Sequence, residues 1–190
     1  VGASYIAPSI TQDDQELINL YPEVDVAKAE GERGVVALYP TPGFVAKLTF
    51  FQNVQVRAMH PFADGTKLYV VAGDGFYEVF ANFIGILRGT MNTAVGAAAI
   101  TDNGTDVYLC DGADRYTYSP TTGTFAVIAD GAFTGADRVD VIDNFIIYNK
   151  PNTNIWGATG LGTTASSALS FGRKDSAPDN IVTLIVNKRE

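Results

Sequence analysis

The sequence has few of the residues from which reactive sites are usually built: one histidine, one cysteine, one tryptophan and two methionines among 190 residues. This scarcity argues against histidine-based triads or dyads and against metal sites that need several histidines. His60 lies directly before Pro61, and we expect it to have a structural role at the end of a strand. Cys110 has no partner for an internal disulfide, and its apolar surroundings predict a small buried side chain rather than a reactive thiol.

Basic side chains are also scarce. The 13 lysines and arginines face 21 acidic residues, which gives a net charge of −8. Because nonspecific affinity for DNA or RNA depends on clustered Lys and Arg, this balance argues against nucleic-acid binding. The sequence has no run of about 18 apolar residues, the length that would predict a membrane span, and the N-terminus lacks a signal-peptide pattern. We therefore expect a soluble protein with no membrane span, no catalytic residues, no metal and no cofactor.

The residues that are abundant point to strands and tight turns. The chain has 19 glycines, nine tyrosines and eleven phenylalanines, and 46% of its residues are hydrophobic. Aromatic residues favour strands, and glycine favours the turns between them. The composition therefore predicts a compact all-β protein.

A strand–turn–strand unit occurs at least twice, at residues 64–79 and 103–118. The two copies are offset by about 39 residues, close to the spacing of four-stranded propeller blades. The residues that match are Gly65 with Gly104, Thr66 with Thr105, Tyr69 with Tyr108, Gly73 with Gly112 and Tyr77 with Tyr116. A third, degenerate copy is expected where Asp143 and Asn144 precede one strand (145–148) and Trp156 lies in the next.

This repeat predicts the N-terminal part of a β-propeller, because a small sheet cannot cover both of its own faces. We expect two regions: an extended N-terminal arm and loop (1–34), and a partial propeller (35–190) of about three to three and a half blades. Within the propeller, residues 44–59 can supply two strands. Closed propellers have about four to eight blades, so the chain is expected to be truncated or completed by another chain. Residues 181–186 are predicted to form a strong strand, and the small residues 96–99 to lie at the narrow inner edge.

Three stretches outside the repeat are distinctive: SYIAPSITQDDQ at 4–15, INLYPE at 18–23 and LYPTPG at 38–43. Because Pro22 cannot donate a backbone hydrogen bond, the second stretch is expected to be an edge strand or an arm. Together these stretches are similar to the opening of the packaged-DNA stabilisation proteins, or tail accessory factors, of short-tailed bacteriophages. Residues 176–190 resemble a strand region of the same family. The possible assembly contacts in the family motif are Asn19, Leu20, Tyr21, Pro22, Glu23, Thr41, Pro42 and Gly43.

The resemblance implies a structural protein of the virion, assembled in the host cytoplasm. Such a protein joins the tail below the portal in several copies, as a homo-oligomeric ring. It helps to retain packaged DNA and connects the portal and adaptor ring to the tail needle and tailspikes. This sequence departs from the family at Pro40, where a glycine is expected, so the turn there must keep a negative φ.

Other interpretations remain open. Aspartates cluster near two turns and could bind calcium, although solvated turns explain them better; they are Asp102, Asp106, Asp111 and Asp114 near one turn, and Asp137, Asp140 and Asp143 near the other. Residues 160–165 loosely match a dinucleotide fingerprint, but the strand–helix context that the motif requires is not indicated. The main alternative function is a propeller-like module that binds glycans or a host receptor. A propeller hydrolase would need a metal or a close carboxylate pair in the central channel.

Overall fold

The computed structural model describes residues 20–24, 36–50, 54–176 and 179–187. Over these ranges the protein is all-β, as the composition predicts, with fourteen strands and no helix. No helix that could span a membrane is therefore found in the described part of the chain. The chain divides into two compact units, Val1–Ala46 and Lys47–Glu190, which are considered separately.

The first unit contains one antiparallel pair of strands, β1 (Leu20–Val24) and β2 (Val36–Pro40). Both strands of a two-stranded sheet are edges, so Pro22 is accommodated within β1 as predicted. The sequence predicts a boundary after residue 34, which would place β2 in the propeller. The compact units instead meet between Ala46 and Lys47, because β2 pairs with β1.

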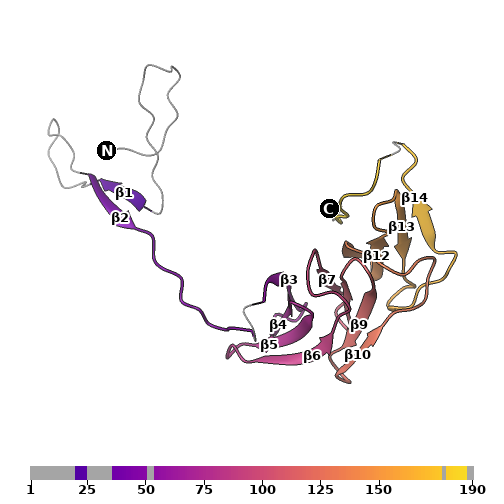
Figure 1. Cartoon of the computed structure of the whole chain (residues 1–190), viewed down its shortest axis with the longest axis horizontal. Coiled ribbons are helices and arrows are strands. Elements are labelled where there is room, and N and C mark those ends of the chain that lie inside the picture. Colours follow the sequence, from indigo (N-terminus) through magenta and orange to yellow (C-terminus); the bar gives the residue numbers. More distant parts are fainter. Residues whose placement is uncertain (1–19, 25–35, 51–53, 177–178, 188–190) are drawn as a thin grey trace, which may run out of the picture. The chain divides into compact units, whose positions relative to one another are not determined.

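The second unit consists of three four-stranded antiparallel sheets, each formed by strands consecutive in the chain (Figure 1). Blade 1 contains β3 (Val56–Pro61), β4 (Lys67–Ala72), β5 (Gly75–Phe80) and β6 (Gly85–Thr90). Blade 2 contains β7 (Ala99–Asp102), β8 (Val107–Cys110), β9 (Arg115–Ser119) and β10 (Thr124–Val127). Blade 3 contains β11 (Val139–Ile142), β12 (Phe145–Asn149), β13 (Ile155–Ala158) and β14 (Phe171–Arg173).

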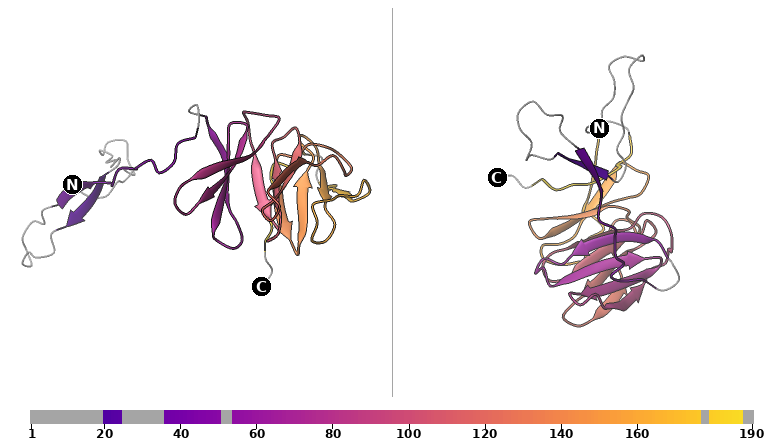
Figure 2. Two further views of the ribbon diagram at one scale, coloured as in Figure 1. Left: turned by 90° about the horizontal axis from the view of Figure 1, so that it is seen from below. Right: turned by 90° about the vertical axis from the view of Figure 1, so that its left-hand side faces the viewer.

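The blades follow one another with their first strands adjacent. Strand β7 contacts both β3 and β11, and β6 contacts β10. Figure 2 shows the three sheets of this unit side by side in chain order. The first strand of each blade is therefore the inner strand, and the fourth is the outer strand, as in a propeller. Of the small residues 96–99, only Ala99 lies on inner strand β7, and residues 96–98 lie in the loop before it.

The core lies between the blades rather than within any one of them. The buried cluster between blades 1 and 2 consists of Phe62, Tyr69, Val71, Phe76, Met91, Val107, Leu109, Tyr116 and Tyr118. The cluster between blades 2 and 3 consists of Tyr108, Cys110, Ile128, Ala136, Ile146 and Tyr148. Each cluster combines side chains from two sheets, which is the physical reason that a single blade is not stable alone.

The third repeat copy is present, with β12 and β13 where the sequence predicts its strands. Its turn is short because Asp143 and Asn144 both adopt positive φ, 48° and 64°, as in the tight turns of hairpins. The copy differs in one respect. Tyr69 and Tyr108 face the following blade, whereas Tyr148 faces back towards blade 2.

One strand prediction was right only in part, and a second was wrong. Of the two strands expected in residues 44–59, the described residues form one, β3, which begins at Val56. Residues 181–186 form no strand, although the Ile181 amide donates to the Thr153 carbonyl and the Val186 amide to Asp140 Oδ2. Because Asp140 lies on β11, the segment runs beside the inner strand of blade 3. It has no backbone ladder, since no strand in the described ranges pairs with it.

Candidate functional site

The inner strands end at a shared open pocket of about 690 Å³. Strands β3, β7 and β11 each contribute residues at or near their C-terminal ends, and the turns that follow them complete the wall. The polar residues of the wall are His60, Thr101, Asp102, Asn103, Asp140, Asp143 and Asn144. The pocket thus combines aspartates from both of the groups that the sequence analysis singled out.

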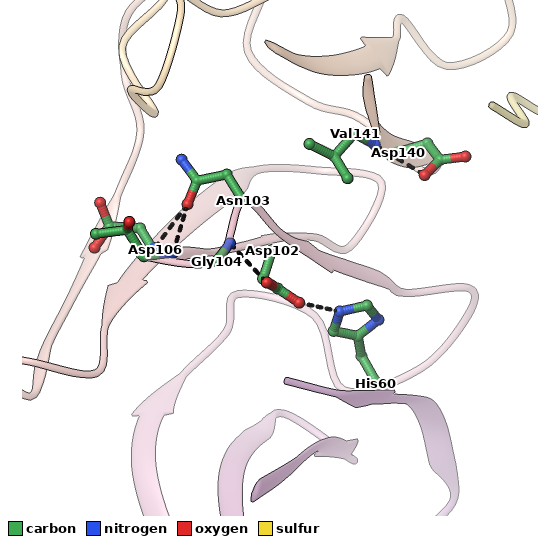
Figure 3. Close-up of polar contacts among 8 residues, drawn as sticks. His60, Asp102, Asn103, Gly104, Asp106, Asp140 and Val141 are labelled. Carbon is green, nitrogen blue, oxygen red and sulfur yellow. Dashed lines mark hydrogen bonds and ion pairs between the residues drawn. The ribbon is translucent and has the colours of Figure 1, made fainter. Parts of the chain in front are cut away.

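The shortest polar contact in this wall joins His60 to Asp102 (Figure 3). His60 Nε2 lies 2.6 Å from Asp102 Oδ2, and the Gly104 amide donates to the other carboxylate oxygen at 2.8 Å. Asp102 is buried, whereas His60 is partly exposed. Both oxygens of Asp102 therefore have partners, and the pair connects blade 1 to blade 2. The predicted structural placement of His60 near the end of a strand is confirmed.

Two other polar side chains of the pocket wall, Asn103 and Asp140, also make contacts within the chain. The Asn103 side-chain oxygen accepts the amide of Asp106, which tightens the turn after β7 (Figure 3). Asp140 accepts the Val141 amide with one oxygen and the Val186 amide with the other. These carboxylates shape the turns and the segment beside them, which is the role that turn-forming Asp and Asn usually have.

The first predicted aspartate group is divided by strand β8. Asp102 and Asp106 precede that strand, whereas Asp111 and Asp114 follow it. Asp111 accepts hydrogen bonds from Thr93 and from the buried hydroxyl of Tyr116. Over the described ranges, no group of three or more His, Cys, Asp or Glu residues is arranged to hold a metal ion.

Sequence reasoning missed a buried charge in the joint between blades 1 and 2. Glu78 is fully buried, and its carboxylate lies 2.7 Å from Lys67 Nζ and 2.5 Å from Arg88 Nη2. Burial alone would raise the pKa of Glu78, but the hydrogen bonds and charges of Lys67 and Arg88 outweigh it and lower that pKa. Tyr118 of blade 2 donates its hydroxyl to the same carboxylate at 3.3 Å. The available signal was an acidic residue within the aromatic strand 76–80.

A second buried charge, Arg115, lies between blades 2 and 3. Its guanidinium donates to the carbonyls of Asp130, Phe133 and Thr134 and to the hydroxyl of Tyr108. It also lies over the ring of Tyr148, with 4.3 Å between Cζ and the ring centroid. This side chain holds the loop between β10 and β11, so its role is structural. Cys110, in the same cluster, is buried as predicted, and its burial raises the pKa of the thiol.

The residues of the family motif all belong to the first unit. Leu20, Tyr21, Pro22 and Glu23 lie on β1, and Thr41, Pro42 and Gly43 lie in the segment after β2; Asn19 lies outside the described residues. Tyr21 stacks on Tyr39 across the two strands, with 5.7 Å between ring centroids, and both rings are exposed. Phe44, one residue beyond the motif, is fully exposed. The described part of this unit thus presents aromatic surface and little charge.

Residues 160–165 lie in the loop between β13 and β14. No helix follows them in the described ranges, so the context that a dinucleotide fingerprint requires is missing.

Comparison with known structures agrees with the propeller geometry. The protein resembles the crystal structure of the computationally designed Ika4 protein, a propeller-like repeat protein, with a TM-score of 0.52 and 12% sequence identity. The match covers 77% of this chain and 89% of Ika4. The fold is propeller-like. No protein-family model and no curated protein sequence matches the chain, and similarity at this identity shows the fold alone.

Proposed function

We propose that this protein is a structural component of a phage tail, which closes the portal channel, helps to retain packaged DNA and provides attachment for further tail proteins. The proposal rests on the resemblance of residues 4–15, 18–23 and 38–43 to the tail accessory factors. Its partners would be the portal and adaptor ring, the tail needle and the tailspikes. It would act as a virion protein without enzymatic activity.

The structural observation that best supports this proposal is the apolar surface of the first unit. Tyr21, Tyr39 and Phe44 are large aromatic side chains that are exposed next to the motif. Aromatic side chains of this kind are the usual anchors of protein–protein interfaces. By contrast, His60, Asp102 and Asp140 in the pocket wall have their partners within the chain. This contrast favours a surface that binds proteins.

Removing the gene from the phage that encodes this protein tests the proposal. Heads are expected to fill with DNA and then lose it, and electron microscopy should show particles without needle and tailspikes. Supplying the wild-type protein should restore full, infectious particles. Particles that remain full and acquire complete tails without the protein would refute the assigned role.

Complementation with single variants locates the attachment surface. Phe44→Ser changes a fully exposed side chain of the first unit and is expected to reduce the yield of full particles at least about tenfold, the effect of losing one interface anchor. Val95→Ser, which changes an exposed apolar residue in the loop between β6 and β7, is the matched control and should complement normally.

The pocket at the ends of the inner strands favours one alternative, a module that binds glycans. Its carboxylate, amide and hydroxyl groups match the hydrogen-bonding needs of sugar hydroxyls. However, Tyr69, Tyr108, Tyr116, Tyr118 and Tyr148 are buried between the blades rather than exposed on loops. Saturable binding of a sugar to the isolated protein, abolished by Asn144→Gly, would favour this alternative over the assembly role. That substitution suits the positive φ of Asn144 and removes its amide from the pocket wall.

A further inference from the structure

The pocket at the ends of the inner strands has more negative than positive charge in its wall. Its described lining residues include three aspartates, Asp102, Asp140 and Asp143, but no lysine or arginine. Asp102 is paired with His60 (Figure 3), whereas Asp140 and Asp143 make no ion pair within the described residues. Carboxylates that line one concave opening add their fields, so the pocket attracts cations.

Thr101 gives a second and independent indication of a ligand. Ala99 packs against the cluster between blades 2 and 3, so Thr101, two residues further along β7, points to the same side. Thr101 lines the pocket with only 4% of its surface exposed, and its hydroxyl has no hydrogen-bond partner among the described residues. A buried hydroxyl without a partner is costly, and a ligand that donates a hydrogen bond in the pocket would remove this cost.

The wall also has a free carboxylate. Asp102 and Asp140 each accept hydrogen bonds from the chain with both oxygens. Asp143 lies in the tight turn after β11, is exposed, and has no hydrogen-bond or ion-pair partner in the described ranges. The pocket volume of about 690 Å³ is within the range of small-molecule sites. The free carboxylate and the buried hydroxyl therefore suit a ligand with several donors that is larger than a metal ion.

We propose that this pocket binds an organic cation, a guanidinium or alkylammonium group, with Asp143 as its charge partner and the Thr101 hydroxyl as a buried acceptor. Such a group carries several N–H donors and no acceptor, which complements this part of the wall. An arginine or lysine of a partner protein, or a free polyamine, can supply it. The inference depends on the described pocket alone and not on a role in a phage tail.

NMR titration of the whole chain with N-acetyl-arginine amide and N-acetyl-lysine amide, at about 20 mM salt, tests this inference. The amide signals of residues 101–104 and 140–144 should shift most, with a Kd of about 1 mM or tighter. N-acetyl-citrulline amide has nearly the same shape as the arginine probe without its charge, and it should bind at least about tenfold more weakly. Putrescine distinguishes the two sources, because tighter binding of putrescine than of the lysine probe would indicate a free polyamine.

Three single variants locate the site. Asp143→Asn suits the positive φ of 48° and should weaken binding about two- to fivefold, as loss of an exposed ion pair does. Thr101→Val should weaken binding about tenfold without lowering the Tm, since the hydroxyl has no partner within the described residues. Asp74→Asn is the control matched in charge. Asp74 is exposed in the turn between β4 and β5, at the opposite end of blade 1, and this variant should bind like the wild type.

Several results would overturn the proposal. Equal binding of the arginine and citrulline probes would show that the pocket does not recognise charge. An Asp74→Asn variant that binds as weakly as Asp143→Asn would show a general effect of net charge. No shift of the pocket signals at about 20 mM of either basic probe would exclude the site. Saturable binding of maltose, a neutral sugar, at these residues without a response to the basic probes would assign the pocket to glycans instead.

Discussion

Glu78 shows how a single buried charge can connect two blades. Its carboxylate binds Lys67 and Arg88 within blade 1 and accepts a hydrogen bond from Tyr118 of blade 2. Removing one member of a buried ion pair usually costs about 3–5 kcal/mol, but the two cations here are about a quarter exposed. We therefore expect Glu78→Gln to lower the free energy of unfolding at pH 7 by about 2 kcal/mol, measured by urea denaturation.

The pH dependence of this effect has a definite sign. The pKa of Glu78 is lower in the folded protein than its ordinary value of 4.5. Ionisation of Glu78 therefore stabilises the fold above about pH 4.5, and this contribution is lost as the pH falls through the folded-state pKa. The difference between wild type and Glu78→Gln should shrink on acidification below pH 4.5. A difference that stays constant from pH 7 to pH 3 would show that the charge is not responsible.

Arg115 stabilises a loop through hydrogen bonds to backbone carbonyls rather than through an ion pair. Arg115→Met would leave the carbonyls of Asp130, Phe133 and Thr134 without their donor. A fully buried group without a partner costs about 1–3 kcal/mol. Because these carbonyls are only partly buried, we expect a loss of about 2 kcal/mol in total. Hydrogen exchange should become faster first in the loop between β10 and β11. Arg115→Lys keeps the charge with fewer donors and should be intermediate, whereas an unchanged loop in Arg115→Met would contradict this role.

At the scale of the strands, one glycine determines how closely blades 1 and 2 approach. A Cβ added to Gly89 on β6 would lie 2.3 Å from ring atoms of Phe125 on β10. Phe125 itself stacks between Phe76 and Tyr116, so its ring cannot move freely. We expect Gly89→Ala to cost about 1–3 kcal/mol of unfolding free energy, as other overpacked cores do.

A double-mutant cycle separates this contact from general effects of the glycine. In a Phe125→Leu background the same substitution should cost less, because the ring is gone. Gly43→Ala is the matched control, since nothing lies within 4 Å of its added Cβ, and it should change stability by less than about 0.5 kcal/mol. Equal costs of Gly89→Ala in both backgrounds would rule out the ring contact as the cause.

The strands that sequence reasoning predicted well are those whose signal is local. Residues 64–79 and 103–118 carry glycine turns between aromatic strands, and both form the middle two strands of a blade. The errors arose where the outcome depends on a distant partner. Residues 181–186 have strong strand propensity, but their backbone amides donate to the Asp140 side chain and the Thr153 carbonyl and form no strand ladder in the described ranges. Strand β2 likewise pairs with β1 instead of a propeller strand.

The candidate pocket was only partly predictable for the same reason. Sequence proximity grouped Asp102 with Asp111, which β8 separates, whereas the blade arrangement brings Asp102 and Asp140 to one pocket. The pairing of His60 with Asp102 depends on how two inner strands lie side by side, and no local pattern encodes it. The buried ion pairs of Glu78 likewise require the fold.

The molecule as a whole separates its fold from its proposed attachment surface. Both buried clusters, and the side chains packed against them, fall between residues 58 and 148, within the second unit. A chain that begins at Lys47 should therefore unfold cooperatively, with a Tm within a few degrees of the full chain. Circular dichroism in the near ultraviolet measures this directly, because the buried tyrosines report on the joints.

If the first unit docks the protein in the tail, the shortened chain should remain folded but fail to restore full particles. A shortened chain that fails to fold would show that residues 1–46 support the blades, and one that restores particles would place the attachment surface on the propeller.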